Sequence, residues 1–268
     1  MIEEEYFGDP SRLHAIKRAA ELWKLLNCSE DYRYYGRAVG LNGPTDDTAE
    51  RMAALARIQG VGICYYCPKE RGQALFSGLA TQGFQTDRHE HYRGGEAAYS
   101  FANEIVKNRS LPSDLNVVQL DRNSRRELVC AVAELCASEG VTPVPGSIMR
   151  GVSVPGVVFA ALDGNGEPIA SASSHQMTKP DFPRGSDVFW GALTTRPDRR
   201  GKGIALVLGA MAIIHMWEVH GARGFTTGVR HDNISSQKLC AKLGVNDTEW
   251  MIAQCIDTEI LGSKRHTK

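Results

Sequence analysis

The pattern of hydrophobic and polar positions predicts a helix-rich first third, followed by alternating strands and helices. Asp9-Pro10 indicates a helix start, because Asp suits the capping position and Pro the first helical position. Further helices are expected over residues 46–57, 69–81 and 96–107, and strands over residues 61–66 and 84–92. This first part therefore reads as a small α/β unit.

A polar stretch containing proline, Arg109 to Asp114, is the best candidate for a linker. It divides the chain into a helix-rich α/β N-terminal domain, residues 1–112, and a second domain, residues 113–268. In the second domain, strands are expected over residues 117–120, 156–162, 168–177, 188–195, 224–230 and 248–256. Helices are expected from Ser124, where the spacing to Glu127 suits a capping box, and over residues 203–220 and 235–243.

Composition narrows the class of protein. Hydrophobic residues make up 42% and charged residues 23% of the 268 residues, values typical of a soluble globular chain. Lys+Arg and Asp+Glu are 31 each, and this balance disfavours a protein that wraps nucleic acid. The acidic start does not resemble a signal peptide, and the longest apolar stretch, residues 203–217, is too short for a membrane span. Seven cysteines, an odd number, suit a reducing compartment, so a cytoplasmic protein without membrane partners is expected.

The segment Thr195 to Ala205 carries the strongest chemical signal. An expected strand enters it and an apolar helix leaves it, and Gly201 and Gly203 allow close approach of a ligand to the backbone. The first N–H groups of that helix lack partners within the helix and lie at the positive end of the helix dipole. Such a helix start can bind a phosphate group. Arg199, Arg200 and Lys202 add positive charge.

Two common phosphate-binding patterns do not fit this turn. A Walker A loop requires Ser or Thr after the lysine, and this sequence has Gly203 there. A dinucleotide-binding fingerprint requires a third glycine where Leu206 stands. ATP and NAD are therefore disfavoured as ligands.

The pattern R-x-x-G-x-G/A does fit, as Arg200-Gly-Lys-Gly203-Ile-Ala205. A second segment, Asn233 to Val245, fits N-x-x-A/S-x-x-L-Y-x-K-L-G-F at a suitable distance. The matching positions are Asn233, Ser236, Leu239, Lys242, Leu243 and Gly244. Together these segments resemble the two motifs of the GNAT N-acetyltransferase superfamily, and the resemblance covers about residues 115–260. It implies an α/β fold with a mixed, mainly antiparallel sheet flanked by helices.

The resemblance also implies acetyl-CoA as co-substrate, without a metal, and assigns residues to it. The backbone of Leu193, Thr194 and Thr195 would bind pantetheine, and an N–H near Leu193 would polarise the thioester carbonyl. The pyrophosphate would rest on the amides of Arg200, Gly201, Lys202, Gly203, Ile204 and Ala205. Asn233 and Ser236 would lie near pantetheine or pyrophosphate, although Asn233 also suits a helix cap.

The catalytic groups are less well indicated. In the family, an amine attacks the thioester directly while protein groups move protons. Cys240 stands where many members have a tyrosine acid, and the glutamate that many members carry on the preceding strand is missing. Cys240 is thus either an acid or a packing residue. His175 and His231 are candidate bases or merely structural and solvated histidines, and Trp190 lies either in the acceptor pocket or in the core.

The expected function is acetyl transfer to a primary amine, first of a small molecule and second of a protein or peptide. A non-catalytic acyl-CoA-binding module is the alternative, and a homodimer is a possible assembly. The strand, helix and strand before residue 93 loosely resemble the second half of the GNAT pattern, without its Arg-Gly loop. They are either a degenerate tandem copy or an unrelated cap, and either arrangement would cover the acceptor cleft. The basic tail from Gly262 to Lys268 is expected to be disordered.

Overall fold

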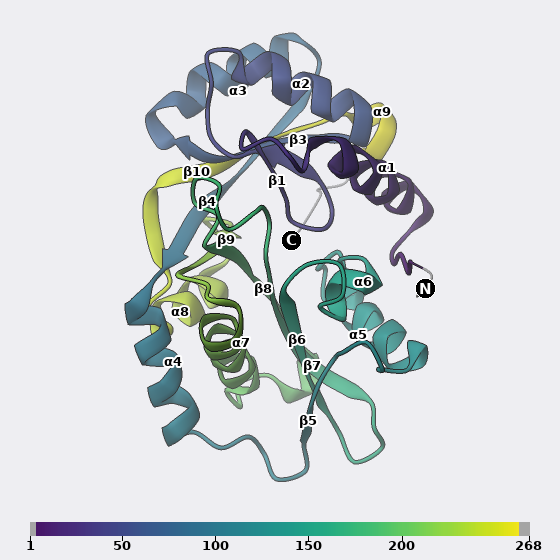
Figure 1. The fold of residues 1–268 in the computed structure, drawn as a ribbon, viewed down its shortest axis with the longest axis vertical. Coiled ribbons are helices and arrows are strands. Elements are labelled where there is room, and N and C mark those ends of the chain that lie inside the picture. Colours follow the sequence, from purple (N-terminus) through teal and green to yellow (C-terminus); the bar gives the residue numbers. More distant parts are fainter. Residues whose placement is uncertain (1–3, 263–268) are drawn as a thin grey trace.

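A single ten-stranded sheet organises the protein, as shown by a computed structural model that describes residues 4–262 (Figure 1). The tail expected to be disordered lies outside the described residues from residue 263 onward. The strand order is β1-β2-β3-β10-β4-β9-β8-β7-β6-β5. The pairings are antiparallel except β2 with β3 and β8 with β9, so the mixed, mainly antiparallel sheet expected from the sequence is confirmed.

The elements follow the hydrophobic pattern closely. The strands are β1 (Tyr32–Tyr34), β2 (Val39–Leu41), β3 (Val61–Pro68), β4 (Gln85–Gly94), β5 (Asn116–Gln119), β6 (Gly156–Leu162), β7 (Pro168–His175), β8 (Asp187–Thr195), β9 (Gly224–Val229) and β10 (Asn246–Ile256). The helices are α1 (Pro10–Leu26), α2 (Thr48–Gln59), α3 (Gly72–Thr81), α4 (Glu96–Asn108), α5 (Arg126–Ser138), α6 (Gly146–Met149), α7 (Ile204–His220), α8 (Ile234–Lys242) and α9 (Thr258–Leu261).

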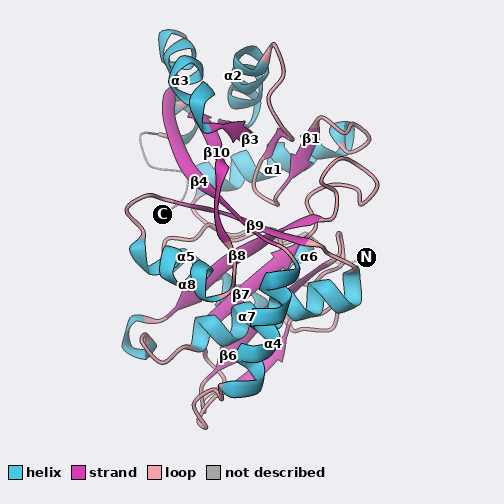
Figure 2. Cartoon of the chain, turned by 90° about the vertical axis from the view of Figure 1, so that its left-hand side faces the viewer, coloured by secondary structure: helices cyan, strands magenta, loops and turns pink. Residues whose placement is uncertain are grey.

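Helices cover both faces of the sheet (Figure 2). Side chains of β6 alternate between two cores: Phe159 packs with residues of α7, whereas Val158 packs with residues of α5. Such alternation is what a strand buried on both faces requires. The apolar helix α7 therefore lies against one face of β6, β7 and β8, with α4 beside it, and α5 lies against the other face.

The sheet runs across the boundary predicted between residues 112 and 113. Strand β10, from the end of the chain, pairs antiparallel with both β3 and β4, and β4 pairs with β9. Strands from the first and last parts of the sequence therefore alternate in the middle of one sheet. Sequence periodicity describes each strand but not its neighbours, so this interleaving was not expected.

One supersecondary unit occurs twice. Strand β3 leads through a 3₁₀ turn, Lys69–Arg71, into α3 and then β4; strand β8 leads through a 3₁₀ turn, Pro197–Arg199, into α7 and then β9. The first unit has an Arg-Gly step at Arg71-Gly72, but both residues are helical there, whereas Gly201 and Gly203 have positive φ in the second unit. In the first unit, β10 fills the space between the parallel strands β3 and β4, whereas β8 and β9 pair directly and only in part.

Some local expectations were wrong. The short strands β1 and β2 and the helix α6 were missed, because three or four residues show no period. Ser124 does not cap α5: its hydroxyl accepts a bond from the Asp121 N–H at 2.9 Å, and the helix begins at Arg126. Within the described part of the chain, no helix has the length and apolar composition needed to cross a bilayer.

Candidate active site

The opening between β8 and β9 shapes the candidate site. The parallel ladder pairs Asp187 with Gly224 and ends at the pair Phe189 and Thr226. Beyond that pair both strands line a cavity of about 810 Å³. An extended ligand placed there would lie along strand edges whose backbone groups have no ladder partner.

A bulge in β8 turns its backbone toward this cavity. The β7–β8 register shifts between Ser171 and Ser173, and opposite the shift Ala192 has a φ of 48°, a conformation that non-glycine residues rarely adopt. The N–H of Arg196 donates to the Ile169 carbonyl at 2.8 Å, so that N–H points toward β7. Because backbone groups alternate along a strand, those of Leu193 and Thr195 point to the open edge.

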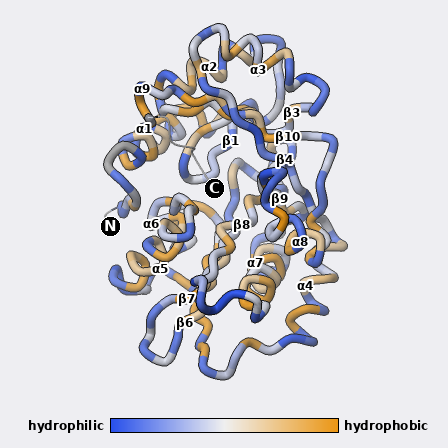
Figure 3. Tube along the Cα trace, turned by 180° about the vertical axis from the view of Figure 1, so that it is seen from behind, coloured by the Kyte–Doolittle hydropathy of each residue, from blue (hydrophilic) through white to orange (hydrophobic). Residues whose placement is uncertain are grey.

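The glycine turn closes one end of the cavity. Gly201 and Gly203 have φ of +79° and +75°, and Gly203 occupies the N-cap of α7 without a side-chain capping bond. A Cβ at Gly201 would meet no atom within 4 Å, so that face of the turn is open. In Figure 3 a hydrophilic turn leads directly into the hydrophobic α7. The uncapped N–H groups at this helix start suit an anion.

The arginines of the turn are held by neighbours. Arg200 donates from Nε to the Thr195 carbonyl at 3.1 Å, and its guanidinium pairs with Glu139. Arg199 pairs with Asp114. These bonds fix the turn but also partly neutralise the charge that the sequence placed there. Arg109, whose Nη1 lies 3.8 Å from a Cβ built at Gly203, lines the cavity too; it was missed because the sequence assigned it to a linker.

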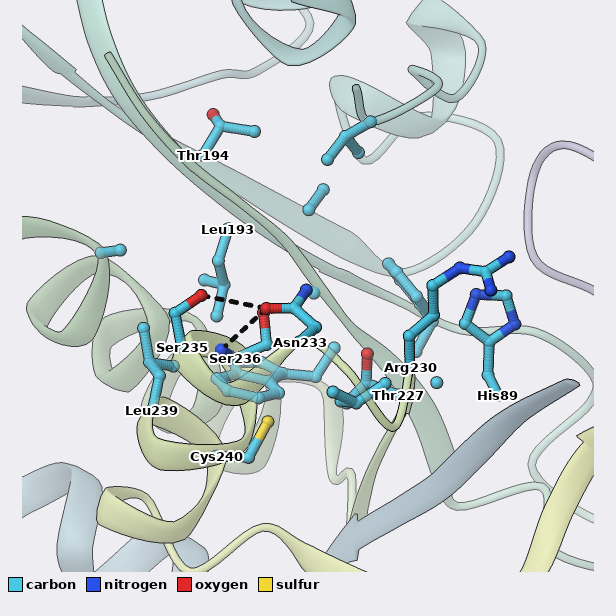
Figure 4. A pocket seen from close by; sticks show the side chains of 18 of the residues that line it. His89, Leu193, Thr194, Thr227, Arg230, Asn233, Ser235, Ser236, Leu239 and Cys240 are labelled. Atoms are coloured by element: carbon cyan, nitrogen blue, oxygen red, sulfur yellow. Dashed lines mark hydrogen bonds between the residues drawn. The ribbon is translucent and has the colours of Figure 1, made fainter. Parts of the chain in front are cut away.

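The second motif begins at the start of α8, where Asn233, Ser235 and Ser236 line the cavity (Figure 4). The Asn233 side-chain oxygen accepts bonds from the Ser236 N–H at 3.1 Å and the Ser235 hydroxyl at 2.9 Å. Asn233 therefore caps the helix, as its alternative interpretation predicted. Asn233 and Ser236 both line the cavity as well, as do all the residues predicted to bind the cofactor: Leu193, Thr194, Thr195, Arg200, Gly201, Lys202, Gly203, Ile204 and Ala205.

Residues 148–245 match the model of the acetyltransferase (GNAT) family. The chain thus contains a GNAT acetyltransferase domain. The match includes both sequence motifs, the β8 bulge and the glycine turn. A search of the curated proteins finds no match to the sequence.

Solved structures of GNAT proteins resemble most of the chain. A GCN5-related N-acetyltransferase from Kribbella flavida is 15% identical, with a TM-score of 0.56 and coverage of 82% of this chain and 80% of that one. A GCN5-related N-acetyltransferase-like protein from Streptococcus suis 89/1591 is 17% identical, with a TM-score of 0.55 and coverage of 83% and 82%. A tandem GNAT protein from the clavulanic acid biosynthesis pathway is 13% identical, with a TM-score of 0.51 and coverage of 77% and 67%. Similarity at this level of identity shows the fold.

The three candidate proton-transfer residues of this GNAT domain lie in different surroundings. Cys240 lines the cavity but is buried, and burial raises the pKa of its thiol to about 12. His175 is buried beside Phe189 with Nε2 3.2 Å from the Tyr35 carbonyl, and burial lowers its pKa to about 3. His231 is exposed on the turn after β9. Neither histidine is among the residues that line the cavity.

Residues outside the GNAT match line the other end of the cavity. Arg33, Arg37 and Tyr65, from β1, the β1–β2 turn and β3, are buried there. His89 and His91 of β4 are also buried and line the cavity. Burial lowers the pKa of each to about 4. The sequence alone does not reveal this end of the cavity, because four separate segments of the chain meet there.

Polar contacts fix these two histidines. The His89 Nδ1 lies 3.1 Å from Gln254 Nε2 of β10, and the His91 Nδ1 lies 3.0 Å from the Thr248 hydroxyl.

Trp190 is fully buried, and its indole N–H donates to the Gly209 carbonyl of α7 at 3.0 Å. Its contacts are those of a core residue, although it borders the cavity. Among the described residues, no group of three His, Cys, Asp or Glu side chains is placed to hold a metal ion.

Proposed function

We propose that the protein is an N-acetyltransferase that transfers the acetyl group of acetyl-CoA to a primary amine of a small molecule. The observation that carries this proposal is the alignment of the β8 bulge, the opening beyond Phe189 and the glycine turn along one cavity. Thr195 lies six residues beyond Phe189 in the sequence, a span of roughly 20 Å along the strand. An extended thioester with a phosphate at one end would suit such a groove.

The proposed cofactor contacts follow from the backbone geometry. Pantetheine amides would pair with the open-edge groups of Leu193 and Thr195, and the pyrophosphate would bind the N–H groups at the start of α7. The Leu193 N–H would then donate to the thioester carbonyl, where negative charge develops as the amine attacks. Attack forms the C–N bond and expels the CoA thiolate, and the amine proton leaves with solvent or the thiol.

A small acceptor suits the enclosed end of the cavity. Side chains of β3, β4 and β10, including Tyr65, His91 and Ile252, close it and are buried. A protein or peptide amine would need to pass these elements, so it is the second choice of acceptor.

The acceptor amine must lose a proton before attack. Buried cationic groups disfavour a second positive charge nearby, so they would lower the amine pKa and favour binding of the neutral form. His89 and His91, with pKa about 4, are neutral at pH 7 and too weakly basic to hold the proton. The buried Cys240 thiol is a poor acid toward a thiolate of pKa ~8.5. Direct attack in a ternary complex therefore needs no side-chain acid or base here.

Calorimetric titration with acetyl-CoA, beside ATP and NAD, tests the cofactor. Selective binding of acetyl-CoA, followed by amine-dependent release of CoA across an acceptor panel, is the expected result. Tight binding of acetyl-CoA without turnover of any amine would instead support a non-catalytic acyl-CoA-binding module. No binding by the folded protein would contradict both functions.

A further inference from the structure

Buried polar atoms without partners gather at one place. In the described part of the chain, five buried side-chain atoms have no hydrogen-bond partner within the protein: Arg37 Nε, Tyr65 Oη, Arg199 Nε, Arg230 Nε and Gln254 Oε1. All five residues line the cavity described above. Buried polar groups are normally satisfied, because leaving one unpaired costs roughly 1–3 kcal/mol. Their concentration in one cavity indicates a ligand that supplies the missing partners.

Two arginines at the enclosed end form no ion pair among the described residues, although Arg33 is near enough to Asp187 to help lower the pKa of that carboxyl. Arg33 is fully buried and Arg37 is 5% exposed. Arg33 donates from Nε to the Asn42 side-chain oxygen at 2.9 Å, and Arg37 lies over the Tyr35 ring with its guanidinium carbon 5.0 Å from the centroid. Among the described ion pairs neither residue appears, whereas Arg93 and Arg230 pair with Asp187 and Asp87.

The charge of the cavity wall is strongly one-sided. Glu139 is the sole carboxylate among the described lining residues, and it is paired with Arg200 beside the glycine turn. At the enclosed end Arg230 pairs with Asp87, whereas Arg33 and Arg37 form no ion pair among the described residues and no other acid lines that wall. A buried cation without an anion is costly, and a ligand anion would relieve that cost.

Arg37 and Tyr65 belong to one cluster. The Tyr35 ring packs edge-on against Tyr65, with centroids 5.9 Å apart, and Arg37 stacks on Tyr35 and on Phe189. Arg33 lies 5.7 Å from the Tyr65 ring centroid. Donors from three segments thus converge beside Phe189, where β8 and β9 begin to part. Gln254 adds an acceptor oxygen, which suits an N–H of the same ligand.

We propose that the acceptor is an amine that also carries a carboxylate, as an amino acid does, and that Arg37 and Tyr65 bind this carboxylate. The inference rests on the proposed acetyl transfer and adds the substrate class. The Arg37 Nε–H and the Tyr65 hydroxyl donate to the two carboxylate oxygens, while Arg33 supplies further positive charge. The Gln254 side-chain oxygen accepts a bond from the acceptor amine and holds its nitrogen toward the bulge at Ala192.

Matched acceptor pairs test the proposal. Glycine, β-alanine, phenylalanine and lysine are each compared with the amine that lacks the carboxylate: methylamine, ethylamine, phenethylamine and cadaverine. Phosphoethanolamine is added as an amine with a different anion. We expect at least one carboxylated probe to exceed its partner amine by about 100-fold in kcat/KM, because unpaired buried donors reject the analogue that lacks the matching group.

The variant Arg37→Met separates binding of the carboxylate from general damage. Its KM for the preferred amino acid should rise by about tenfold or more, while the value for the partner amine changes by less than about threefold. Its thermal midpoint should not fall, because an unpaired buried charge is removed. Tyr65→Phe should show the same selective rise. The matched control is Arg122→Met on an exposed loop, which should change neither value.

The outcomes distinguish this inference from the proposed function. Equal use of both members of each pair, or a preference for phosphoethanolamine, overturns the carboxylate assignment but leaves acetyl transfer intact. If no amine releases CoA, thermal shifts with the same probes in the presence of CoA still decide the matter. Stabilisation by carboxylated probes that is lost in Arg37→Met supports the site, and absence of any shift overturns it. Acetyl-CoA calorimetry reports separately on the cofactor.

Discussion

Phe189 of β8 and Thr226 of β9 form the last pair of the parallel ladder, and the strands part beyond them. The Tyr35 ring packs on Phe189 at that point, with centroids 6.2 Å apart. The N-terminal segment therefore covers the start of the opening in the GNAT domain, and the glycine turn lies at its other end. In the N-terminal unit, β10 lies between β3 and β4 and pairs with both. That unit therefore has no opening of its own and instead forms part of the cavity wall.

Gly203→Glu should weaken acetyl-CoA binding by at least about tenfold, or ~1.4 kcal/mol. The new carboxylate would stand where the proposed pyrophosphate binds, at the uncapped start of α7. Calorimetry on the folded variant measures the change. Gly164→Glu is the matched control, because Gly164 lies in an exposed hairpin with no atom within 4 Å of an added Cβ. Unchanged affinity in Gly203→Glu would place the cofactor elsewhere.

Cys240→Ser should leave kcat within a few-fold of the wild-type value. The buried thiol, with its pKa raised to about 12, would have to give a proton to the CoA thiolate, and this transfer is uphill because an ordinary cysteine thiol has a pKa of only ~8.5. Steady-state CoA release measures kcat, and circular dichroism checks the fold. A loss of about 100-fold in a folded variant would show that Cys240 is an acid after all.

The pH dependence of kcat/KM should follow the acceptor amine rather than a histidine. Because His89 and His91 have pKa values near 4, both are already neutral above pH 6. The rate should therefore rise with pH up to the pKa of the free amine, without an inflection between about 6 and 7. Initial rates at subsaturating acceptor measure the profile. An inflection near 6.5 that disappears in His89→Gln or His91→Gln would identify a histidine base.

Acid should destabilise the protein from about pH 6.5 downward. His89, His91 and His175 have native pKa values of about 4, 4 and 3, whereas an unfolded histidine titrates near ~6.5. The unfolded state therefore binds more protons in this range, so the stability present above pH 6.5 is lost as the pH falls toward the native values. Each histidine would contribute about 2 kcal/mol of loss at pH 5.

Urea unfolding at pH 7 and pH 5 measures this loss. His175→Gln should reduce the difference between the two pH values, because its amide does not titrate and retains a donor for the Tyr35 carbonyl. His231→Gln is the control on an exposed turn and should leave the difference unchanged. If His175→Gln lost as much stability between pH 7 and pH 5 as the wild-type protein, His175 would not contribute to the acid sensitivity.

Trp190→Phe should destabilise the fold by about 1–3 kcal/mol. The indole N–H that donates to Gly209 is lost, and the smaller ring leaves space in a fully buried position. Thermal or urea unfolding measures the change. If the free energy of unfolding of Trp190→Phe were unchanged while the KM for the acceptor rose, Trp190 would act mainly in the acceptor pocket rather than in the core.

The sequence was sufficient for the parts of the molecule that are local. The hydrophobic pattern marked β6 to β9, the apolar run marked α7, and Gly201 and Gly203 marked the turn between strand and helix. Two motifs separated by a predictable strand and turn led to the family, because their spacing follows from consecutive elements. The residues predicted to bind the cofactor lie in two short segments, 193–205 and 233–236, and the fold brings both segments to one cavity.

The tertiary structure alone decided what lines the other end of that cavity. Contacts between segments far apart in the chain decide that β10 pairs with β3 and β4. Such contacts also bring four residues to one cavity: Arg33, Arg37, His89 and Gln254. Hydrophobic periodicity specifies which face of a strand is buried, but not which neighbour covers it. The end of the cavity proposed to hold the acceptor is built from such long-range pairings, so its charge, on which the proposed class of acceptor rests, is visible only in the folded chain.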